Sequence, residues 1–230
     1  MVVNHGIPVK LMQQLQVVAK QFFELPAAEK EAVAAKADKD IEGEVNHEEY
    51  TKQVKKLMEK LLGWLSEGLG LPSEVLTQSI GGETAEYVIR FNFYPPCPQS
   101  EFALGAAEHT DIGALTLLVP NEVQGLQAFK DEHWFDLDYI NPAVVVIIGD
   151  QLMRMSNGRY KSVRHRATLD KANMRISWPV FVAPRHYVVV VGPLPELTGD
   201  ENPPKFESIV YKDYLLQKIR DWALEDHPLY

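Results

Sequence analysis

The first third of the chain carries apolar residues that recur every three or four positions, which is the period of an amphipathic helix. These stretches predict three helices, over residues 9–22, 26–37 and 48–69. The third has the strongest pattern: its apolar stripe is interpreted as core packing, and charged residues fill the opposite face. Gly70 and Pro72 end this predicted helix.

After Gly81 and Gly82 the apolar residues recur every second position, as they do in β-strands. The pattern predicts strands over residues 87–94, 109–119, 124–129, 134–137, 143–149, 161–168, 174–182 and 187–191. Turn signals separate them, including the hairpin dipeptide Asn157-Gly158. A last helix is predicted from Tyr211 to Leu224. Many short strands in succession indicate an antiparallel sandwich or barrel such as a jelly roll, flanked by helices.

Composition restricts the class of protein. With 230 residues, 46% of them hydrophobic, the chain can bury a sizeable core in one domain. A net charge of −9 argues against nucleic acid as a partner, because phosphate binding needs a basic surface. The single cysteine, Cys97, excludes an intramolecular disulfide framework. We see no membrane span and no signal peptide, and we expect a monomeric, cytoplasmic protein.

Two separate parts of the sequence carry metal-ligand residue types. His109 and Asp111 are two residues apart, and on a strand that spacing puts both side chains on one face. His165 lies in another strand-like stretch. Two histidines and one carboxylate on neighbouring strands can bind one face of a divalent metal and leave the other open, as in non-haem Fe(II) oxygenases. The motif is weak alone, because seven histidines give many accidental pairs.

A second group follows His165. Strand alternation puts Arg175 and Ser177 on one face and Ile176 and Trp178 on the other. An arginine that faces a barrel interior costs free energy unless an anion meets it. A guanidinium beside a hydroxyl suits a carboxylate ligand. The alternative is a structural ion pair with an internal carboxylate such as Asp150.

Together, several motifs resemble the plant 2-oxoglutarate- and Fe(II)-dependent dioxygenases. They are His-Thr-Asp at 109–111, His165, Arg-x-Ser at 175–177, Asn-Phe-Tyr-Pro-Pro-Cys-Pro at 92–98, Asn-His-Gly-Ile-Pro at 4–8, the segment 119–127 and Ser-Asn-Gly at 156–158. The last three are close to the flavonol synthase and anthocyanidin synthase branch. The resemblance covers nearly the whole chain.

The resemblance implies a double-stranded β-helix core over residues 84–210, a helical layer over 1–83 and a C-terminal helix over 211–230. It implies that iron is held by His109, Asp111 and His165. It implies that 2-oxoglutarate is bound by Arg175 and Ser177, with Tyr94 and Asn92 assisting. The substrate pocket would be lined by Arg90, Phe181 and the residue at position 183, Ala183.

The implied reaction couples decarboxylation of 2-oxoglutarate to succinate with hydroxylation or desaturation of a hydrophobic, flavonoid-like small molecule. Oxygen would be the second cosubstrate and ascorbate the reductant. Flavonol synthases carry an acidic residue where this chain has Ala183, which cannot accept a hydrogen bond from a polyphenol hydroxyl. A different aromatic or alkaloid-like substrate is therefore an alternative.

The chain is also shorter than the family it resembles. In that family a loop and strand follow the second helix and cover the substrate pocket, whereas this chain has about ten residues there, 38–47. An open pocket favours uncoupled turnover, so a non-catalytic or uncoupled scaffold is one alternative. Another is a cupin-like binding protein or a zinc hydrolase. Hydrolysis would need a general base near the metal-bound water. The matched strands offer no extra carboxylate there, and Arg175 would have no purpose.

Overall fold

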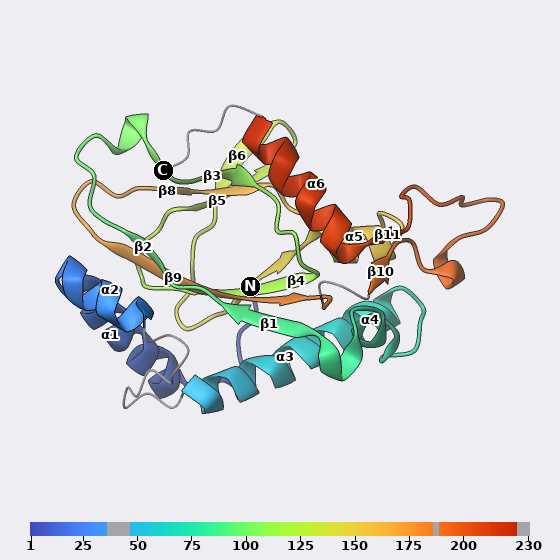
Figure 1. Cartoon of the computed structure of the whole chain (residues 1–230), viewed down its shortest axis with the longest axis horizontal. Coiled ribbons are helices and arrows are strands. Elements are labelled where there is room, and N and C mark those ends of the chain that lie inside the picture. The colour runs from blue at the N-terminus through green and yellow to red at the C-terminus, as the bar shows by residue number, and fades with distance from the viewer. Residues whose placement is uncertain (36–46, 186–188, 225–230) are drawn as a thin grey trace.

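A computed structural model of the chain describes residues 1–35, 47–185 and 189–224 (Figure 1). Its N-terminal part contains the helices α1 (Val9–Glu24), α2 (Ala27–Ala35), α3 (His47–Gly68) and α4 (Val75–Ser79). The predicted first and third helices are confirmed. The second is confirmed over the described residues, and the predicted loop at 38–47 lies outside them, apart from its last residue, His47. The short helix α4 was not predicted.

The strands described in the remainder form two large antiparallel sheets and one two-stranded sheet. The first contains β1 (Glu86–Ile89), β2 (Asn92–Tyr94), β9 (Arg175–Ala183), β4 (Leu115–Pro120) and β7 (Val145–Ile148). The second has the order β3 (Leu104–His109), β8 (His165–Thr168), β5 (Leu126–Lys130) and β6 (His133–Asp136). Figure 1 shows them as two layers, which confirms a mainly β fold of the jelly-roll type with flanking helices.

The remaining elements are short, except for the last helix. They are α5 (Asp150–Met155), the pair β10 (Val190–Val191) and β11 (Ile209–Val210), three 3-10 turns at 82–84, 100–102 and 195–197, and α6 (Tyr211–Leu224). The helix α6 confirms the predicted C-terminal helix. Of the predicted strand at 187–191, residues 187 and 188 lie outside the described part. No described helix is long and apolar enough to cross a membrane.

The core lies between the helices and the first sheet. Met58 and Leu62 of α3 pack in one apolar cluster with Ile176 and Trp178 of β9. The alternation predicted for β9 is therefore correct: these side chains face the helices, and Arg175 faces the other sheet. This cluster contains residues from both sides of residue 83, so the proposed division of the chain at that point stays a prediction.

Two predicted strands are corrected by the structure. The segment 109–119 is not one strand, because β3 ends at His109 and β4 begins at Leu115. The bend between them brings Gly113 against β9, where an added Cβ would lie 2.7 Å from the Val182 carbonyl oxygen. The segment 87–94 is two strands, β1 and β2. Both pair with β9, and the Arg90 N–H binds the Pro179 carbonyl oxygen between them, so the pairing register is continuous.

Asn157-Gly158 does not form a hairpin turn between two strands. It ends α5, with both residues at positive φ (50° and 77°), the conformation that closes many helices. Near the N-terminus, Val2 forms an antiparallel β-bridge with Val144, with backbone N–O distances of 2.8 and 2.9 Å.

Candidate active site

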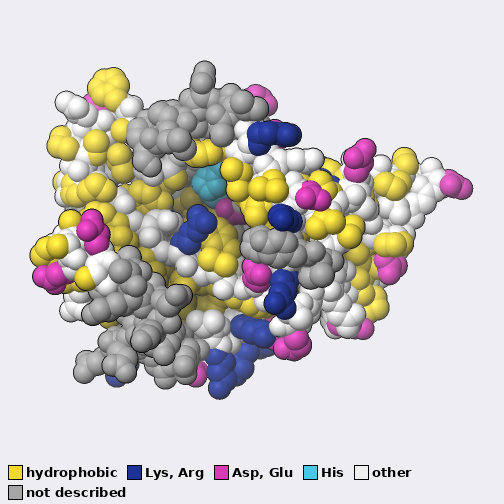
Figure 2. All heavy atoms as spheres, viewed as in Figure 1, with side chains coloured by type: hydrophobic (Ala, Val, Ile, Leu, Met, Phe, Trp, Pro, Cys, Tyr) yellow, Lys and Arg dark blue, Asp and Glu magenta, His cyan; other side chains and the backbone are white. Residues whose placement is uncertain are grey.

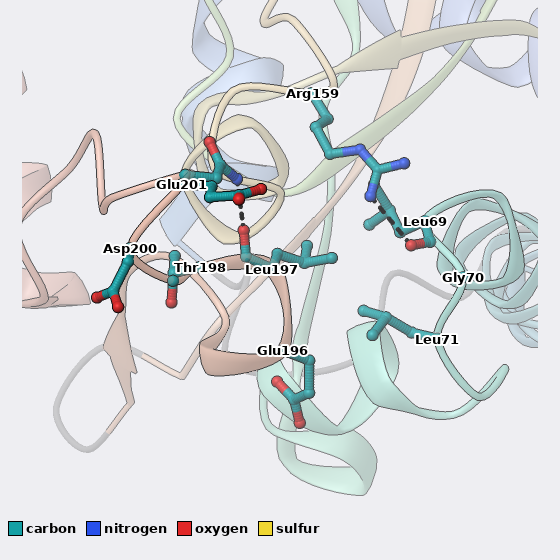
Figure 3. A pocket seen from close by; sticks show the side chains of 11 residues that line it. Leu69, Gly70, Leu71, Arg159, Glu196, Leu197, Thr198, Asp200 and Glu201 are labelled. Carbon is teal, nitrogen blue, oxygen red and sulfur yellow. Dashed lines mark hydrogen bonds between the residues drawn. The ribbon is translucent and has the colours of Figure 1, made fainter.

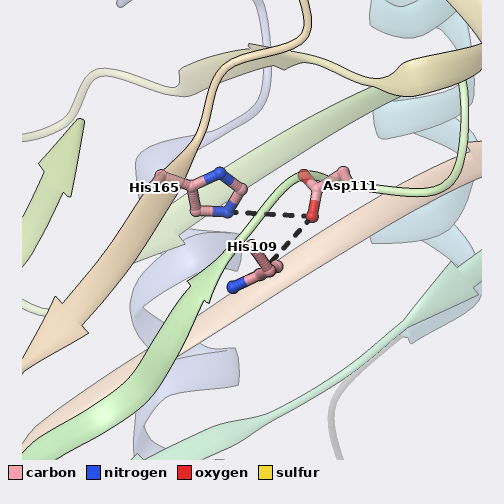
Figure 4. A group of neighbouring side chains, drawn as sticks. All are labelled: His109, Asp111 and His165. Atoms are coloured by element: carbon pink, nitrogen blue, oxygen red, sulfur yellow. Dashed lines mark ion pairs between the residues drawn. The ribbon is translucent and has the colours of Figure 1, made fainter. Parts of the chain in front are cut away.

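The three predicted metal ligands converge at the end of the second sheet (Figure 4). His109 is the last residue of β3 and pairs directly with His165, the first residue of β8. Their ring centroids are 4.3 Å apart. Asp111 follows in the bend after β3, and the ligand atoms of all three residues lie within 4.8 Å of one another. A carboxylate and two imidazoles this close can share one divalent ion.

Both imidazoles are oriented by backbone carbonyls. The Nδ1 of His109 lies 2.8 Å from the Ala107 oxygen, and the Nδ1 of His165 lies 2.9 Å from the Val163 oxygen. If each Nδ1 donates its hydrogen there, each Nε2 is left with a free lone pair, as a metal ligand needs. The two Nε2 atoms lie 3.8 and 3.7 Å from Oδ1 of Asp111.

The protonation state of His109 also favours metal binding. Burial lowers the pKa of His109, and the neighbouring His165 lowers it further. The imidazole is therefore held in the neutral form, in which its nitrogen can coordinate a cation.

The Asp111 carboxylate is fixed from behind by Thr116 of β4. The Thr116 hydroxyl donates to Oδ2 at 2.6 Å, which leaves Oδ1 facing the two imidazoles. Both residues are buried. Sequence reasoning missed Thr116, although it is a polar residue inside an otherwise apolar strand close to a proposed ligand, and that signal could have singled it out.

The predicted 2-oxoglutarate residues lie on two paired strands. Asn92 pairs with Ser177, and Tyr94 pairs with Arg175, so all four side chains share one face. The Asn92 amide donates to the Ser177 hydroxyl at 3.4 Å. Burial raises the pKa of the Tyr94 phenol, and the neighbouring Arg175 charge opposes that shift.

Arg175 is only 2% exposed, and its Nε has no hydrogen-bond partner in the structure. Burial lowers the pKa of its guanidinium, against the opposing effect of Tyr94. No carboxylate among the described residues forms an ion pair with it. Asp150, the partner of the alternative interpretation, is bonded instead to Ser162, Tyr214 and Lys218. Arg175 is therefore a buried cation that can accept an anionic ligand.

One cavity joins the two groups. It is lined by the three proposed metal ligands, by Asn92, Tyr94, Arg175 and Ser177, and by the apolar side chains Leu118, Leu126, Ile147, Pro179 and Phe181, among others. Figure 2 shows a histidine side chain in a hollow bordered by hydrophobic atoms, with a basic side chain beside it. Metal-ligand and anion-binding groups thus face the same enclosed space.

The predicted substrate residues are placed differently from one another. Phe181 lines the cavity. The Arg90 guanidinium lies 5.8 Å from the centroid of the Phe181 ring, outside the residues that line the cavity. Ala183 packs in a separate apolar cluster with Val191 and Tyr211. The structure therefore does not bring Ala183 to the cavity, and its role in substrate binding stays a prediction.

A second hollow lies away from this site, between the end of α3 and the segment 196–202 (Figure 3). Arg159 lines this hollow and donates a hydrogen bond to the Leu69 carbonyl oxygen at 3.0 Å. Its charged side chains include Glu196, Asp200 and Glu201. None of the proposed ligands borders it, so the candidate active site is the cavity between the sheets.

Comparison with known proteins agrees with this geometry. Residues 85–184 match the model of the 2OG-Fe(II) oxygenase superfamily, and residues 1–80 match that of the non-haem dioxygenase N-terminal region in morphine synthesis. Probable flavonol synthase 5 of Arabidopsis thaliana is 60% identical, over 100% of this chain and 81% of its own length. A flavonol synthase/flavanone 3-hydroxylase of the same plant is 50% identical, over 97% and 79%.

Solved structures show the same fold. The crystal structure of JOX2 in complex with 2OG, Fe and JA has a TM-score of 0.88 and 29% identity, covering 94% of this chain and 76% of JOX2. The rice dioxygenase for auxin oxidation has a TM-score of 0.80 at 22% identity, over 96% and 85%. The chain is a dioxygenase-type oxidoreductase: it belongs to the 2-oxoglutarate- and Fe(II)-dependent oxygenase superfamily, and it resembles the flavonol synthases within it.

Proposed function

We propose that this protein oxidises a flavonoid-like small molecule, by hydroxylation or desaturation, and couples the reaction to decarboxylation of 2-oxoglutarate. One observation carries the proposal: a buried arginine without an anionic partner shares a cavity with a two-histidine, one-carboxylate cluster. An Fe(II) ion and a dicarboxylate would satisfy both groups at once.

The residues present fit the iron. His109, Asp111 and His165 would hold it through two Nε2 atoms and one carboxylate oxygen, from one side. The second oxygen of Asp111 is already occupied by Thr116. When bound, the iron and 2-oxoglutarate supply the oxidising chemistry, and the protein supplies binding, orientation and exclusion of water.

The residues present also fit the cosubstrate. Arg175 and Ser177 would bind its distal carboxylate, with Tyr94 and Asn92 beside them on the paired strand. A planar guanidinium can donate two parallel hydrogen bonds to a carboxylate, which fixes its direction as well as its position. Bound in this way, the dicarboxylate would point its other end toward the metal ligands across the cavity that all these residues line.

The substrate class follows from the relatives and from the lining. Relatives at 50% and 60% identity are named flavonol synthases. Phe181, Leu126 and Ile147 give the cavity an apolar wall suited to an aromatic ring system. Arg90 beside Phe181 offers a cation to a phenolic oxygen. We propose oxygen as the second cosubstrate, ascorbate as the reductant and a monomeric enzyme.

One observation favours a second candidate, an uncoupled or non-catalytic scaffold. The match to probable flavonol synthase 5 extends over 265 residues, whereas this chain has 230, a difference of 35. We propose that the missing positions include a segment that would cover the pocket, at the place where this chain has residues 38–47. Without that cover, water could reach the site.

The test measures succinate and oxidised products from 2-oxoglutarate, Fe(II) and ascorbate, with a panel of dihydroflavonols and flavanones. An oxidised flavonoid, formed only when Fe(II) and 2-oxoglutarate are both present, is the expected result. Asp111→Ala is the matched control, and it should abolish turnover by removing the anionic ligand. Succinate without any oxidised flavonoid would favour the uncoupled scaffold. Undiminished turnover in Asp111→Ala would overturn the metal assignment.

A further inference from the structure

A buried carboxylate lies directly behind the proposed metal ligands. Asp150, the first residue of α5, is 2% exposed. Its Oδ1 accepts a hydrogen bond from the Ser162 hydroxyl at 2.7 Å, and its Oδ2 accepts one from the Tyr214 hydroxyl at 2.7 Å. Lys218 forms an ion pair with the same Oδ2. Tyr214 and Lys218 both come from α6, so the C-terminal helix supplies the only cation that is paired with this carboxylate among the described residues.

The backbone around Asp150 is bonded to the bend that carries Asp111. The Asp150 N–H donates to the Asp111 carbonyl oxygen at 2.8 Å, and the Gly149 N–H donates to that of Ala114 at 2.9 Å. A Cβ on Gly149 would lie 2.3 Å from the Gly113 carbonyl oxygen, so the two backbone segments are too close for a side chain to fit between them. A shift of Asp150 would therefore move the bend that holds Asp111.

The same carboxylate also borders the second ligand segment. Ser162, which donates to Asp150, immediately precedes Val163. The Val163 carbonyl oxygen accepts the hydrogen bond that orients the His165 ring. The Val163 N–H donates to Ile148, at the end of β7, at 3.3 Å. Asp150 thus contacts the segments that position two proposed ligands, Asp111 and His165, which are 54 positions apart in the sequence.

Lys218 reaches the ligand segment directly as well. Its ammonium group contacts the hydroxyl of Thr110, which lies between His109 and Asp111. The ammonium group therefore bridges Thr110 and Asp150. A buried carboxylate that loses its cation is costly, and the structure around it must rearrange to admit water or a proton.

We propose that Lys218 is a positioning residue of the metal site: from α6 it holds Thr110 and Asp150, and through them the orientation of Asp111 and His165. This inference rests on the proposed metal role of those ligands. Groups that orient metal ligands from the outside typically contribute about 10- to 100-fold to metal affinity. We expect Lys218→Met to weaken metal binding by about that factor.

The experiment titrates the full chain with Co(II), a probe that does not need oxygen chemistry, and records its affinity and visible absorption spectrum. Thermal unfolding without metal is measured in parallel. Lys218→Met and Thr110→Val should both weaken Co(II) binding and alter the spectrum. Thr110→Val keeps the Lys218–Asp150 ion pair, so it should leave metal-free stability close to that of the parent. Arg220→Met is the control, because this exposed residue of α6 pairs with Asp221 at 3.6 Å.

The outcomes separate this inference from the proposed function. If Lys218→Met does not fold, Thr110→Val alone decides. Unchanged Co(II) affinity and spectrum in the folded variants, with Asp111→Ala losing the metal, would overturn the positioning role and leave the metal site standing. Undiminished Co(II) binding by Asp111→Ala would overturn the metal assignment itself, and the positioning role with it. Equal weakening by Arg220→Met would show that the effect is not specific to Lys218 and would also overturn the inference.

Discussion

At the scale of single residues, Arg175 combines a proposed binding role with a cost in stability. It is buried, and its Nε has no partner in the structure. We expect Arg175→Met to raise the free energy of unfolding of the ligand-free protein by about 1 kcal/mol or more, because a desolvated cation is removed. The same change should weaken 2-oxoglutarate binding about 10- to 100-fold, as expected for a lost charged hydrogen bond of about 1.5–3 kcal/mol. Urea unfolding and anaerobic calorimetry measure the two effects.

The opposite signs make this prediction sharp. A structural arginine with an internal ion pair would behave the other way: Arg175→Met would destabilise the protein and leave the apparent affinity for 2-oxoglutarate unchanged. The exposed Arg220→Met serves as the control for loss of one positive charge. Which of the two interpretations held could not be derived from the sequence. Asp150 was available as a partner by composition, and only the positions of Tyr214 and Lys218 show that it is already engaged.

The proposed ligands could be predicted from the sequence more easily than the residues that orient them. The motif spacing singled out His109, Asp111 and His165 as proposed ligands, and the structure brings them together. The reason first given for His109 and Asp111, two side chains on one strand face, does not hold, because Asp111 lies in a bend after β3. The sequence does offer Thr116 as a polar residue inside an apolar strand, but its hydrogen bond to Asp111 depends on that bend, which local patterns do not predict.

At the scale of elements, basic and aromatic side chains hold β8 against β5 and β6. The guanidinium of Arg166 lies 4.1 Å from the Trp134 ring centroid, and that of Arg164 lies 3.8 Å from the Phe129 ring centroid. Trp134 and Phe129 are themselves in contact, with centroids 5.1 Å apart. Because Arg164 and Arg166 flank His165, these contacts help to fix the position of the strand that carries His165.

Trp134 contacts both arginines, since the Arg164 guanidinium also lies 5.8 Å from its ring centroid. We expect Trp134→Leu to lower the free energy of unfolding by about 1–2 kcal/mol, from these two cation–π contacts of about 0.5–1 kcal/mol each. Chemical denaturation measures the change. Phe102→Leu is the control: Phe102 is 86% exposed, and its replacement should alter stability by less than about 0.5 kcal/mol. Equal stability of the Trp134 variant and the parent would show that these cation–π contacts contribute nothing to the free energy of unfolding.

Helices and strands were predicted correctly where burial of one face determines the residue pattern. The stripe of α3 and the alternation of β9 were predicted correctly because burial on one face dominates both. Asn157-Gly158 was misassigned as a hairpin turn, because positive φ also ends helices, and only the contacts of α5 distinguish the two uses. The split of 109–119 depends on the approach of Gly113 to Val182, which is 69 positions away in sequence.

At the scale of the whole molecule, the strand count indicated a sandwich or barrel, but strand order is a long-range property. β9 pairs with β1, β2 and β4, and β8 pairs with β3 and β5. Those pairings place the proposed metal ligands and Arg175 in one cavity. Alternation alone could not predict them, and the motif resemblance supplied the architecture instead.

The residues proposed to bind metal and cosubstrate therefore lie mostly on the two sheets. The chain is, however, 35 residues shorter than the matched part of probable flavonol synthase 5. Closure over an active site excludes water and suppresses side reactions. We expect 2-oxoglutarate turnover to continue here with incomplete coupling, so that succinate exceeds oxidised flavonoid. The Arabidopsis flavonol synthase/flavanone 3-hydroxylase, assayed alongside, provides the reference ratio. Equal ratios in the two proteins would mean that the strand-borne residues alone provide the enclosure that coupling needs.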